Sequence, residues 1–421
     1  MTTSDRPRTS STRFSAPAWV RAHAGDIVLW TIVLGSFVVG YLAYMLREQY
    51  FYPDSRYYLA MAYWFGGETQ ESARNLTIDF AAMYGQDVPE MGKLFGWGLV
   101  QPRVVLPLLA AIPVRLFGPF GLAGTVLVIF IVMTIVFTII LKRRYGNVVA
   151  ATVMLVINGS SHLMQFNGGM ITESLSALWS ALTLVVAWWW FAKRRGWMLL
   201  LLAATVVGAA FTRQATFIVA GAFVIAWLLG SLLQRRWNDW TLPAIVVAAT
   251  SLGCQVLQTI VFPSFSQLDQ FFLKTGTDNL GDALLNAPRM ALYIIKGDVY
   301  TFLNEDVATL VLILLALLGA VLHFKRPEAH LLIGAILGTA IYNVTNGTPT
   351  QFRYAVPGLI FFALAAALAV RSASEKAAAR PAFVDPAIAD SSSTGPRDPR
   401  PADQPGTTPI ASASGGASRR T

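Results

Sequence analysis

The sequence has little charge and almost no cysteine. Only 13% of its 421 residues are charged, whereas about a quarter is usual in a soluble domain. Its single cysteine, Cys254, excludes a disulfide framework and a thiolate metal site, and the four histidines lack the spacing of metal ligands. No Walker sequence and no glycine-rich nucleotide fingerprint is present. These absences argue against an ATPase and against a nucleotide-sugar enzyme with a soluble domain.

The sequence instead has many long apolar runs. A transmembrane helix needs about 20 mostly apolar residues, and 55% of the chain is hydrophobic. Ten runs are predicted to cross a membrane: 27–46, 120–141, 147–163, 172–192, 197–211, 214–233, 241–262, 307–324, 330–344 and 354–371. The stretch 197–233 counts as two, since a single helix of that length would measure about 55 Å against a hydrocarbon core of about 30 Å. We therefore predict an all-α, polytopic integral membrane protein with about 10 transmembrane helices.

Lysine and arginine predict how the chain is oriented, because cytoplasmic loops carry an excess of both. If the runs simply alternate, the Arg-bearing N-terminus and four basic clusters fall on one side: 142–144, 193–195, 235–236 and 325–326. We expect a multi-pass protein of the cell (plasma) membrane with this side, including both termini, in the cytoplasm.

The same pattern predicts the domain organisation. Residues 1–25 form a basic cytoplasmic N-terminus, 26–371 the transmembrane domain, and 372–421 a tail rich in Ala, Pro, Ser and Gly that is expected to be disordered. Two long loops, 47–119 and 263–305, fall on the extracytoplasmic side. The first loop is aromatic and partly apolar, which favours helices along the membrane surface.

One segment of the first loop is ambiguous. Residues 103–117 look like a further helix, but the run is short and contains Pro107 and Pro113. Counting it as a crossing would move every later basic cluster to the outside. We therefore predict an interfacial or re-entrant helix there.

Charged residues gather at the predicted extracytoplasmic ends of the spans. They are Asp54, Arg103, Glu173, Arg213 and Arg353. Each alone has an ordinary structural explanation, because charged side chains at span ends commonly anchor a helix at the interface. Together they share one depth and one face, three basic and two acidic. That combination predicts a polar cavity for an anionic ligand.

Asp54 has two interpretations. It follows Pro53 and precedes a predicted helix, so it could be a helix cap. Alternatively, its carboxylate stands at the start of a surface helix, with Tyr57 and Tyr58 expected on the same face. In that position it could take a proton from an attacking hydroxyl.

This arrangement resembles the GT-C superfamily of membrane glycosyltransferases, which includes protein O-mannosyltransferases, lipid A aminoarabinose transferases and bacterial mannosyl- and arabinosyltransferases. The resemblance covers 27–371 and is carried by loose patterns. These are the acidic residue of YPDSRYYLAMA after the first span, QPRVVLPLLAAIPVRLFG at 101–118, Thr172-Glu173-Ser174 opening the fourth span, Phe211-Thr212-Arg213-Gln214 between two short spans, and Arg353-Tyr354 opening a late span.

The resemblance implies an inverting glycosyltransferase with a sugar donor on polyprenyl phosphate and a hydroxyl acceptor on a protein, lipid or polysaccharide. Asp54 would be the general base, and Arg213 and Arg353 would bind the lipid-linked phosphate. Glu173 and Arg103, with Tyr57, Tyr58 and Tyr354, would shape the substrate pocket. The acidic residue stands alone rather than as a DxD pair, so no carboxylate-bound metal is expected, although a divalent cation is not excluded.

Two other functions stay open on the sequence alone. The same outer arginines could serve a transporter or flippase of an anionic or amphipathic lipid, or the chain could be a non-catalytic scaffold. A transporter needs access from both faces, whereas the apolar runs are nearly free of charge in their middle. This distribution favours an enzyme. The net charge of +9 does not indicate a nucleic-acid partner, since the basic residues sit in short clusters between apolar runs and in the tails.

Overall fold

The apolar runs fold into helices in the computed structural model, which describes residues 18–378 except 236 and 263–265. The chain divides into two units, Met1–Ser374 and Glu375–Thr421. Within the described ranges, six helical segments have the length and apolarity of a membrane span: residues 23–47 of α1 (Ala18–Arg47), α6 (Phe120–Tyr145), α9 (Glu173–Lys193), α11 (Thr216–Gln234), α12 (Thr241–Val261), and Arg353–Lys376, which joins η1 (Arg353–Gly358) to most of α17 (Leu359–Ala378). The prediction of a helical membrane protein is confirmed.

The count of about 10 spans is not confirmed. The remaining predicted spans correspond to α7 (Asn147–Asn158) with α8 (Ser161–Gly168), α10 (Trp197–Ala210), α15 (Val307–Leu322) and α16 (Pro327–Asn346). α10 and α15, with 14 and 16 residues, measure about 21 and 24 Å at ~1.5 Å per residue, short of a hydrocarbon core of about 30 Å. α7 and α8 form a pair bent by 78°, which would be a seventh span if it crosses as one.

A polar junction explains the bend between α7 and α8. Ser160 caps α8 by accepting a hydrogen bond from the Leu163 amide (2.9 Å), and its hydroxyl donates to Asp306 Oδ2 (2.6 Å). Asp306 itself caps α15, with Oδ1 accepting from the Thr309 amide (3.1 Å). The bend is therefore fixed to the start of α15, because one carboxylate serves both helix ends.

Both predicted outer loops contain helices. The first holds α2 (Ser55–Phe65), α3 (Gln70–Ala82), α4 (Met91–Gly96) and α5 (Val105–Phe117), and the second holds α13 (Gln267–Thr275) and α14 (Leu280–Asn304). The ambiguous segment 103–117 largely forms α5, which packs against α2 and α6. Its interfacial or re-entrant placement stays a prediction.

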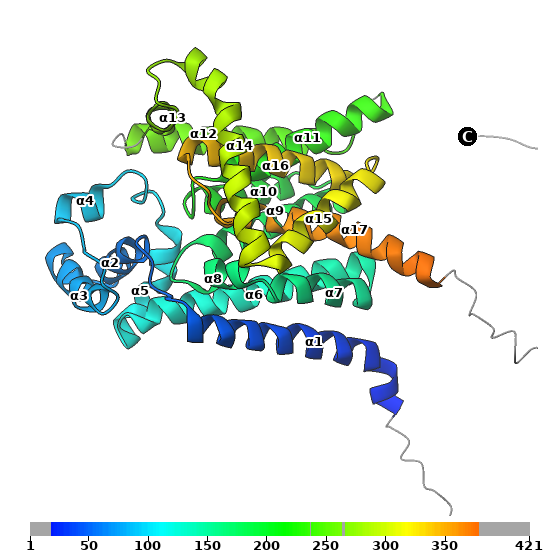
Figure 1. The fold of residues 1–421 in the computed structure, drawn as a ribbon, viewed down its shortest axis with the longest axis horizontal. Helices are drawn as coiled ribbons and strands as arrows, with labels where there is room; N and C mark the ends of the chain where they lie inside the picture. The colour runs from blue at the N-terminus through cyan, green and yellow to red at the C-terminus, as the bar shows by residue number, and fades with distance from the viewer. Residues whose placement is uncertain (1–17, 236, 263–265, 379–421) are drawn as a thin grey trace, which may run out of the picture. The chain divides into compact units, whose positions relative to one another are not determined.

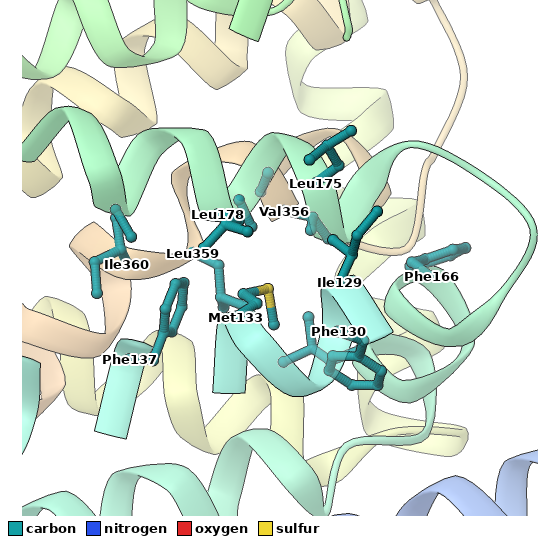
Figure 2. Close-up of a cluster of buried hydrophobic side chains, with 14 of the residues drawn as sticks. Ile129, Phe130, Met133, Phe137, Phe166, Leu175, Leu178, Val356, Leu359 and Ile360 are labelled. Atoms are coloured by element: carbon teal, nitrogen blue, oxygen red, sulfur yellow. The ribbon is translucent and has the colours of Figure 1, made fainter. Parts of the chain in front are cut away.

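The helix that follows Arg353 lies at the centre of the bundle. Within Arg353–Lys376, 83% of the apolar stretch long enough to span a membrane is buried inside the protein, against 22% of the corresponding stretch of α1. Helix α1 runs along one edge in Figure 1. In the cluster of Figure 2, Val356, Leu359 and Ile360 from η1 and α17 lie close to side chains of α6 and α9. The position of Arg353 is thus set by an enclosed helix. Residues 379–421 of the predicted tail and residues 1–17 of the predicted N-terminus lie outside the described residues.

Glycines bring α11 and α16 into close contact. A Cβ at Gly334 would lie 2.2 Å from the Gly221 carbonyl oxygen, and one at Gly338 would lie 2.6 Å from the Ile218 Cα. The small-xxx-small spacing of Gly334 and Gly338 is typical of closely packed membrane helices. This contact fixes α16 beside the turn that carries Arg213.

Candidate functional site

Four of the five predicted charged residues form one continuous ionic network. Arg353 Nη2 donates to Asp54 Oδ2 at 2.6 Å, and Arg353 Nε donates to Glu173 Oε1 at 2.5 Å. Arg213 Nη1 lies 2.7 Å from the same Glu173 oxygen. The network therefore runs from Asp54 through Arg353 and Glu173 to Arg213, and Arg353 is its central member.

The network has an accessible layer and a buried layer. The side chains of Asp54 and Arg353 are 25% and 22% exposed, whereas those of Glu173 and Arg213 are 0% and 1% exposed. A ligand arriving from solvent would meet Arg353 and Asp54 first. The buried pair lies behind them and fixes the orientation of the Arg353 guanidinium.

Each charged residue lies where a helix begins or ends. Asp54 is at the N-cap position of α2, yet its side chain makes no capping hydrogen bond and bonds to Arg353 instead. Glu173 opens α9, Arg213 lies in the turn between α10 and α11, and Arg353 opens η1. The Asp54 side chain therefore does not cap α2.

Arg103, the fifth charged residue, makes no ion pair with the described residues of the network and contacts Tyr58 instead. It is almost fully buried, and its Nη1 donates to the Tyr58 hydroxyl at 2.9 Å. Tyr57 does not share this contact, since its ring packs against Trp97 at 5.1 Å and beneath the Arg56 guanidinium. The two tyrosines have different partners because adjacent helical residues point about 100° apart.

Two tyrosine rings lie beside Arg213. Its guanidinium carbon is 5.2 Å from the centre of the Tyr354 ring and 5.8 Å from that of Tyr342. The two rings are 4.7 Å apart. Cation–π attraction therefore adds to the ion pair that holds Arg213. Tyr342, from α16, was not predicted, because it sits inside an apolar run with no charged neighbour to mark it.

Several buried polar atoms of this region have no hydrogen-bond partner among the residues that the structure describes. Glu173 Oε2, Arg103 Nε and Arg213 Nε are among them, and Arg213 Nη1 makes no hydrogen bond of ordinary geometry despite its short approach to Glu173. The neighbouring side chains Thr172, Ser174 and Gln214 add further unpartnered oxygens. Buried polar groups are nearly always hydrogen-bonded. Such a concentration is typical of a ligand site.

The charge balance of the site favours an anion. Asp54 and Glu173 supply two carboxylates, and Arg103, Arg213 and Arg353 supply three guanidinium groups, which leaves one positive charge in excess. Burial acts to raise the pKa of Asp54, but the attraction of Arg353, Arg103 and Arg213 outweighs it and the pKa is lowered. Asp54 is therefore ionised at neutral pH and ready to accept a proton or a hydrogen bond.

A cavity of about 270 Å³ is lined by residues of α14, α15, α16, η1 and α17 and by Phe352. Mainly apolar side chains line it, including Ile294, Phe302, Leu317 and Val344. Phe352 immediately precedes Arg353, and Ala355, two residues after it, also lines the cavity. The segment that carries Arg353 therefore also forms part of the wall of an apolar cavity.

A carboxylate from the second loop holds that segment. Asp298 of α14 uses Oδ1 to accept hydrogen bonds from the backbone N–H groups of Thr350 and Gln351, both at 2.8 Å. Asp298 was not predicted, because its partners are backbone groups more than fifty residues away that leave no signal in the sequence.

Metal ligation has no support from the geometry. The described part of the chain contains no group of three or more histidine, cysteine, aspartate or glutamate side chains that could hold a metal ion. The expectation that no carboxylate-bound metal takes part stays a prediction.

Comparison of the chain with protein families, with curated proteins and with solved structures found no match.

Proposed function

We propose that the protein is an inverting membrane glycosyltransferase of the GT-C type. It would move a sugar from a polyprenyl phosphate to a hydroxyl acceptor on the extracytoplasmic face. The observation that carries the proposal is the network Asp54–Arg353–Glu173–Arg213, in which a partly exposed carboxylate and a partly exposed guanidinium lie 2.6 Å apart. A general base and a phosphate-binding group are the two parts that such a transfer requires.

The reaction would use Asp54 on the acceptor hydroxyl and Arg353 on the leaving phosphate. Asp54 takes the proton of the acceptor hydroxyl as that oxygen bonds to the anomeric carbon of the sugar. The bond between the same carbon and the phosphate oxygen breaks, and the polyprenyl phosphate leaves with the electron pair. Attack opposite the leaving group inverts the anomeric configuration.

Arg353 would stabilise the departing phosphate. A guanidinium has five N–H donors in a planar fork that fits phosphate. Arg353 commits one donor to Asp54 and one to Glu173, so the others stay available to a ligand. The buried Glu173 holds this guanidinium in place through its contact with Arg353 Nε, and the buried Arg213 in turn pairs with Glu173. Preorganised charge of this kind is usually a large term in catalysis.

The apolar cavity suits a lipid-linked donor. Phe352 and Ala355 belong both to its wall and to the segment around Arg353. A phosphate held by Arg353 would place the first isoprene units of its chain in the cavity, away from water. Arg103, Tyr58 and Tyr354 then lie nearer the sugar or acceptor, as the resemblance implies. Tyr57, which packs on Trp97, would line the same substrate pocket, as the resemblance implies.

A transporter or flippase is the weaker alternative. The network is built from residues at the starts of α2, α9 and η1 and in the turn between α10 and α11. These positions share one end of the bundle, whereas the substrate sites of secondary transporters lie near the bilayer midplane. The geometry therefore favours an enzyme.

Donor binding provides the first test of the proposal. Undecaprenyl phosphate should bind the purified protein in detergent, whereas undecaprenol, which lacks the phosphate, should bind much more weakly. Arg353→Ala should remove this preference for the phosphate. Equal binding of the two lipids to the wild-type protein would refute the phosphate site.

Transfer itself is tested with mannosyl and arabinosyl polyprenyl phosphates carrying a radiolabelled sugar. They would be supplied to membranes that contain the protein or its Asp54→Asn variant. Label should move to acceptors in the membrane only with the wild-type protein. A flippase would instead move fluorescent undecaprenyl phosphate between vesicle leaflets without releasing sugar.

A further inference from the structure

Arg353 is presented by a short strap that lies across α14. The strap is residues 347–352, Gly-Thr-Pro-Thr-Gln-Phe, and it joins α16 to η1. Its last two residues have left-handed backbone angles, φ 53° at Gln351 and 73° at Phe352. The Arg353 N–H donates to the Thr350 carbonyl at 2.8 Å and closes the turn. Glycine or asparagine normally occupies such positions, so Gln-Phe here needs support from outside the turn.

Three contacts supply that support. Pro349 lies so close to α14 that a Cβ at Gly297 would be 2.5 Å from its Cγ. The next residue of α14, Asp298, accepts both the Thr350 and Gln351 N–H groups. The Phe352 ring is buried between Phe302 and Phe362, with ring centres 6.4 and 5.1 Å away.

We propose that Asp298 is a positioning residue for the donor phosphate, acting through Arg353. It holds the strained turn that ends at Arg353 and so fixes the guanidinium between Asp54 and Glu173. The inference rests on the proposed function, since it assigns Asp298 a part in the same phosphate site. It also makes α14, in the second predicted outer loop, part of the donor site although it contributes no residue to the ionic network.

Asp298 holds the strap through a single oxygen, Oδ1, rather than through its negative charge. Both N–H groups bond to Oδ1, at 2.8 Å each. Burial raises the pKa of Asp298 even though the N–H groups of Gln351 and Thr350 and the nearby His162 oppose this. An asparagine side chain keeps a carbonyl oxygen at the same place. Asp298→Asn should therefore preserve the strap, and Asp298→Ala should release it.

The test measures undecaprenyl phosphate binding by the purified full-length protein in detergent. We compare wild type with Asp298→Ala, Asp298→Asn, Arg353→Ala and the double variant Asp298→Ala/Arg353→Ala. Asp298→Ala should weaken binding about tenfold or more, as expected for losing the two hydrogen bonds that hold the strap. Asp298→Asn should stay within about twofold of wild type. Asp298→Ala should have no further effect once Arg353 is absent, because it acts through that residue.

A second measurement does not depend on any ligand. Hydrogen–deuterium exchange of peptides covering 347–353 should be faster in Asp298→Ala but unchanged in Asp298→Asn. Gly297→Ala should also speed exchange, because the added methyl group displaces Pro349. Asp282→Ala, on the same helix but in its exposed first turn, is the matched control and should change neither readout.

The outcomes separate this inference from the proposed function. If Arg353→Ala weakens phosphate binding and Asp298→Ala does not, the positioning role is wrong and the phosphate site stands. An equal loss from Asp298→Ala with and without Arg353 would also overturn it, as would failure of Asp298→Asn to restore binding. If wild type shows no preference for the phosphate, the proposed function fails, and the exchange data still decide whether Asp298 holds the strap.

Discussion

Arg353 donates a hydrogen bond to Asp54 at 2.6 Å although 299 residues separate them in the chain. The contact joins the first helix of the predicted outer region to the start of the most enclosed span. It also means that Asp54, the proposed base, and Arg353, the proposed phosphate-binding residue, neutralise each other when no substrate is bound. Binding of an anion to Arg353 would weaken its hold on Asp54, and the freed carboxylate would become a better proton acceptor.

Asp54→Asn should separate binding from catalysis. Transfer of labelled sugar should fall by about 10²–10⁴-fold, the usual contribution of a positioned general base. Binding of undecaprenyl phosphate should become tighter, because the carboxylate that competes for Arg353 is gone. Both quantities are measured on the same purified protein. Asp79→Asn, an exposed position in the same predicted loop, is the control and should alter neither. Weaker lipid binding in Asp54→Asn would contradict the competition between the two anions.

Arg213→Met should destabilise the protein strongly. Removing one partner of a buried ion pair costs about 3–5 kcal/mol, because it leaves the other charge uncompensated. The loss should lie near the lower figure, since Arg353 still reaches Glu173. Adding Glu173→Gln to Arg213→Met should recover part of it, because the uncompensated carboxylate is then neutral. Thermal unfolding in detergent measures both variants. Strictly additive losses would show that the two side chains do not act as a pair.

The ion pair of Asp54 should survive mild acid. Its pKa is lowered from the ordinary value of 3.8, so the stability that it contributes is complete above that value and is lost as the pH falls through the lowered pKa. The difference in melting temperature between wild type and Asp54→Asn should stay constant from about pH 7 to pH 5 and shrink only below pH 4. A difference that titrates near neutral pH would mean that the pKa of Asp54 is raised instead.

Labelling of single cysteines should establish the orientation. In a Cys254→Ser background, a membrane-impermeant maleimide should label Asp79→Cys in intact cells. Arg195→Cys should be labelled only after permeabilisation. Both positions are exposed, so access depends on the side of the membrane alone. The reverse pattern would place the ionic network on the cytosolic side and remove the proposed extracytoplasmic reaction.

The meeting of Asp54, Glu173, Arg213 and Arg353 could be anticipated because each stands at an end of an apolar run on the same predicted side. Alternation of spans brings such ends together without any knowledge of packing. The number of spans could not be derived in this way, since apolarity does not reveal whether short helices such as α10 and α15 cross the membrane or that α7 and α8 meet at a bend. Composition alone cannot distinguish a buried helix from a spanning one.

The residues that were missed share a different property. Tyr342 contacts Arg213 through the face of its ring, and Asp298 binds backbone N–H groups. Neither contact requires a particular residue type nearby in the sequence. Tyr57 and Tyr58 show the converse, because neighbouring positions in one motif end up against Trp97 and Arg103 respectively. The different partners of Tyr57 and Tyr58 could be identified only once the directions of their side chains on α2 were known.

The order of the network along the chain bears on how the protein is made. Asp54, Glu173 and Arg213 are all synthesised well before Arg353, which comes at the start of the most enclosed helix. Until the helix that begins at Arg353 is inserted, a newly synthesised chain holds both carboxylates with Arg103 and Arg213 but lacks the arginine that joins Asp54 to Glu173. Biogenesis should therefore have a late, all-or-none step, and chains interrupted shortly before residue 353 should be good substrates for membrane quality-control proteases.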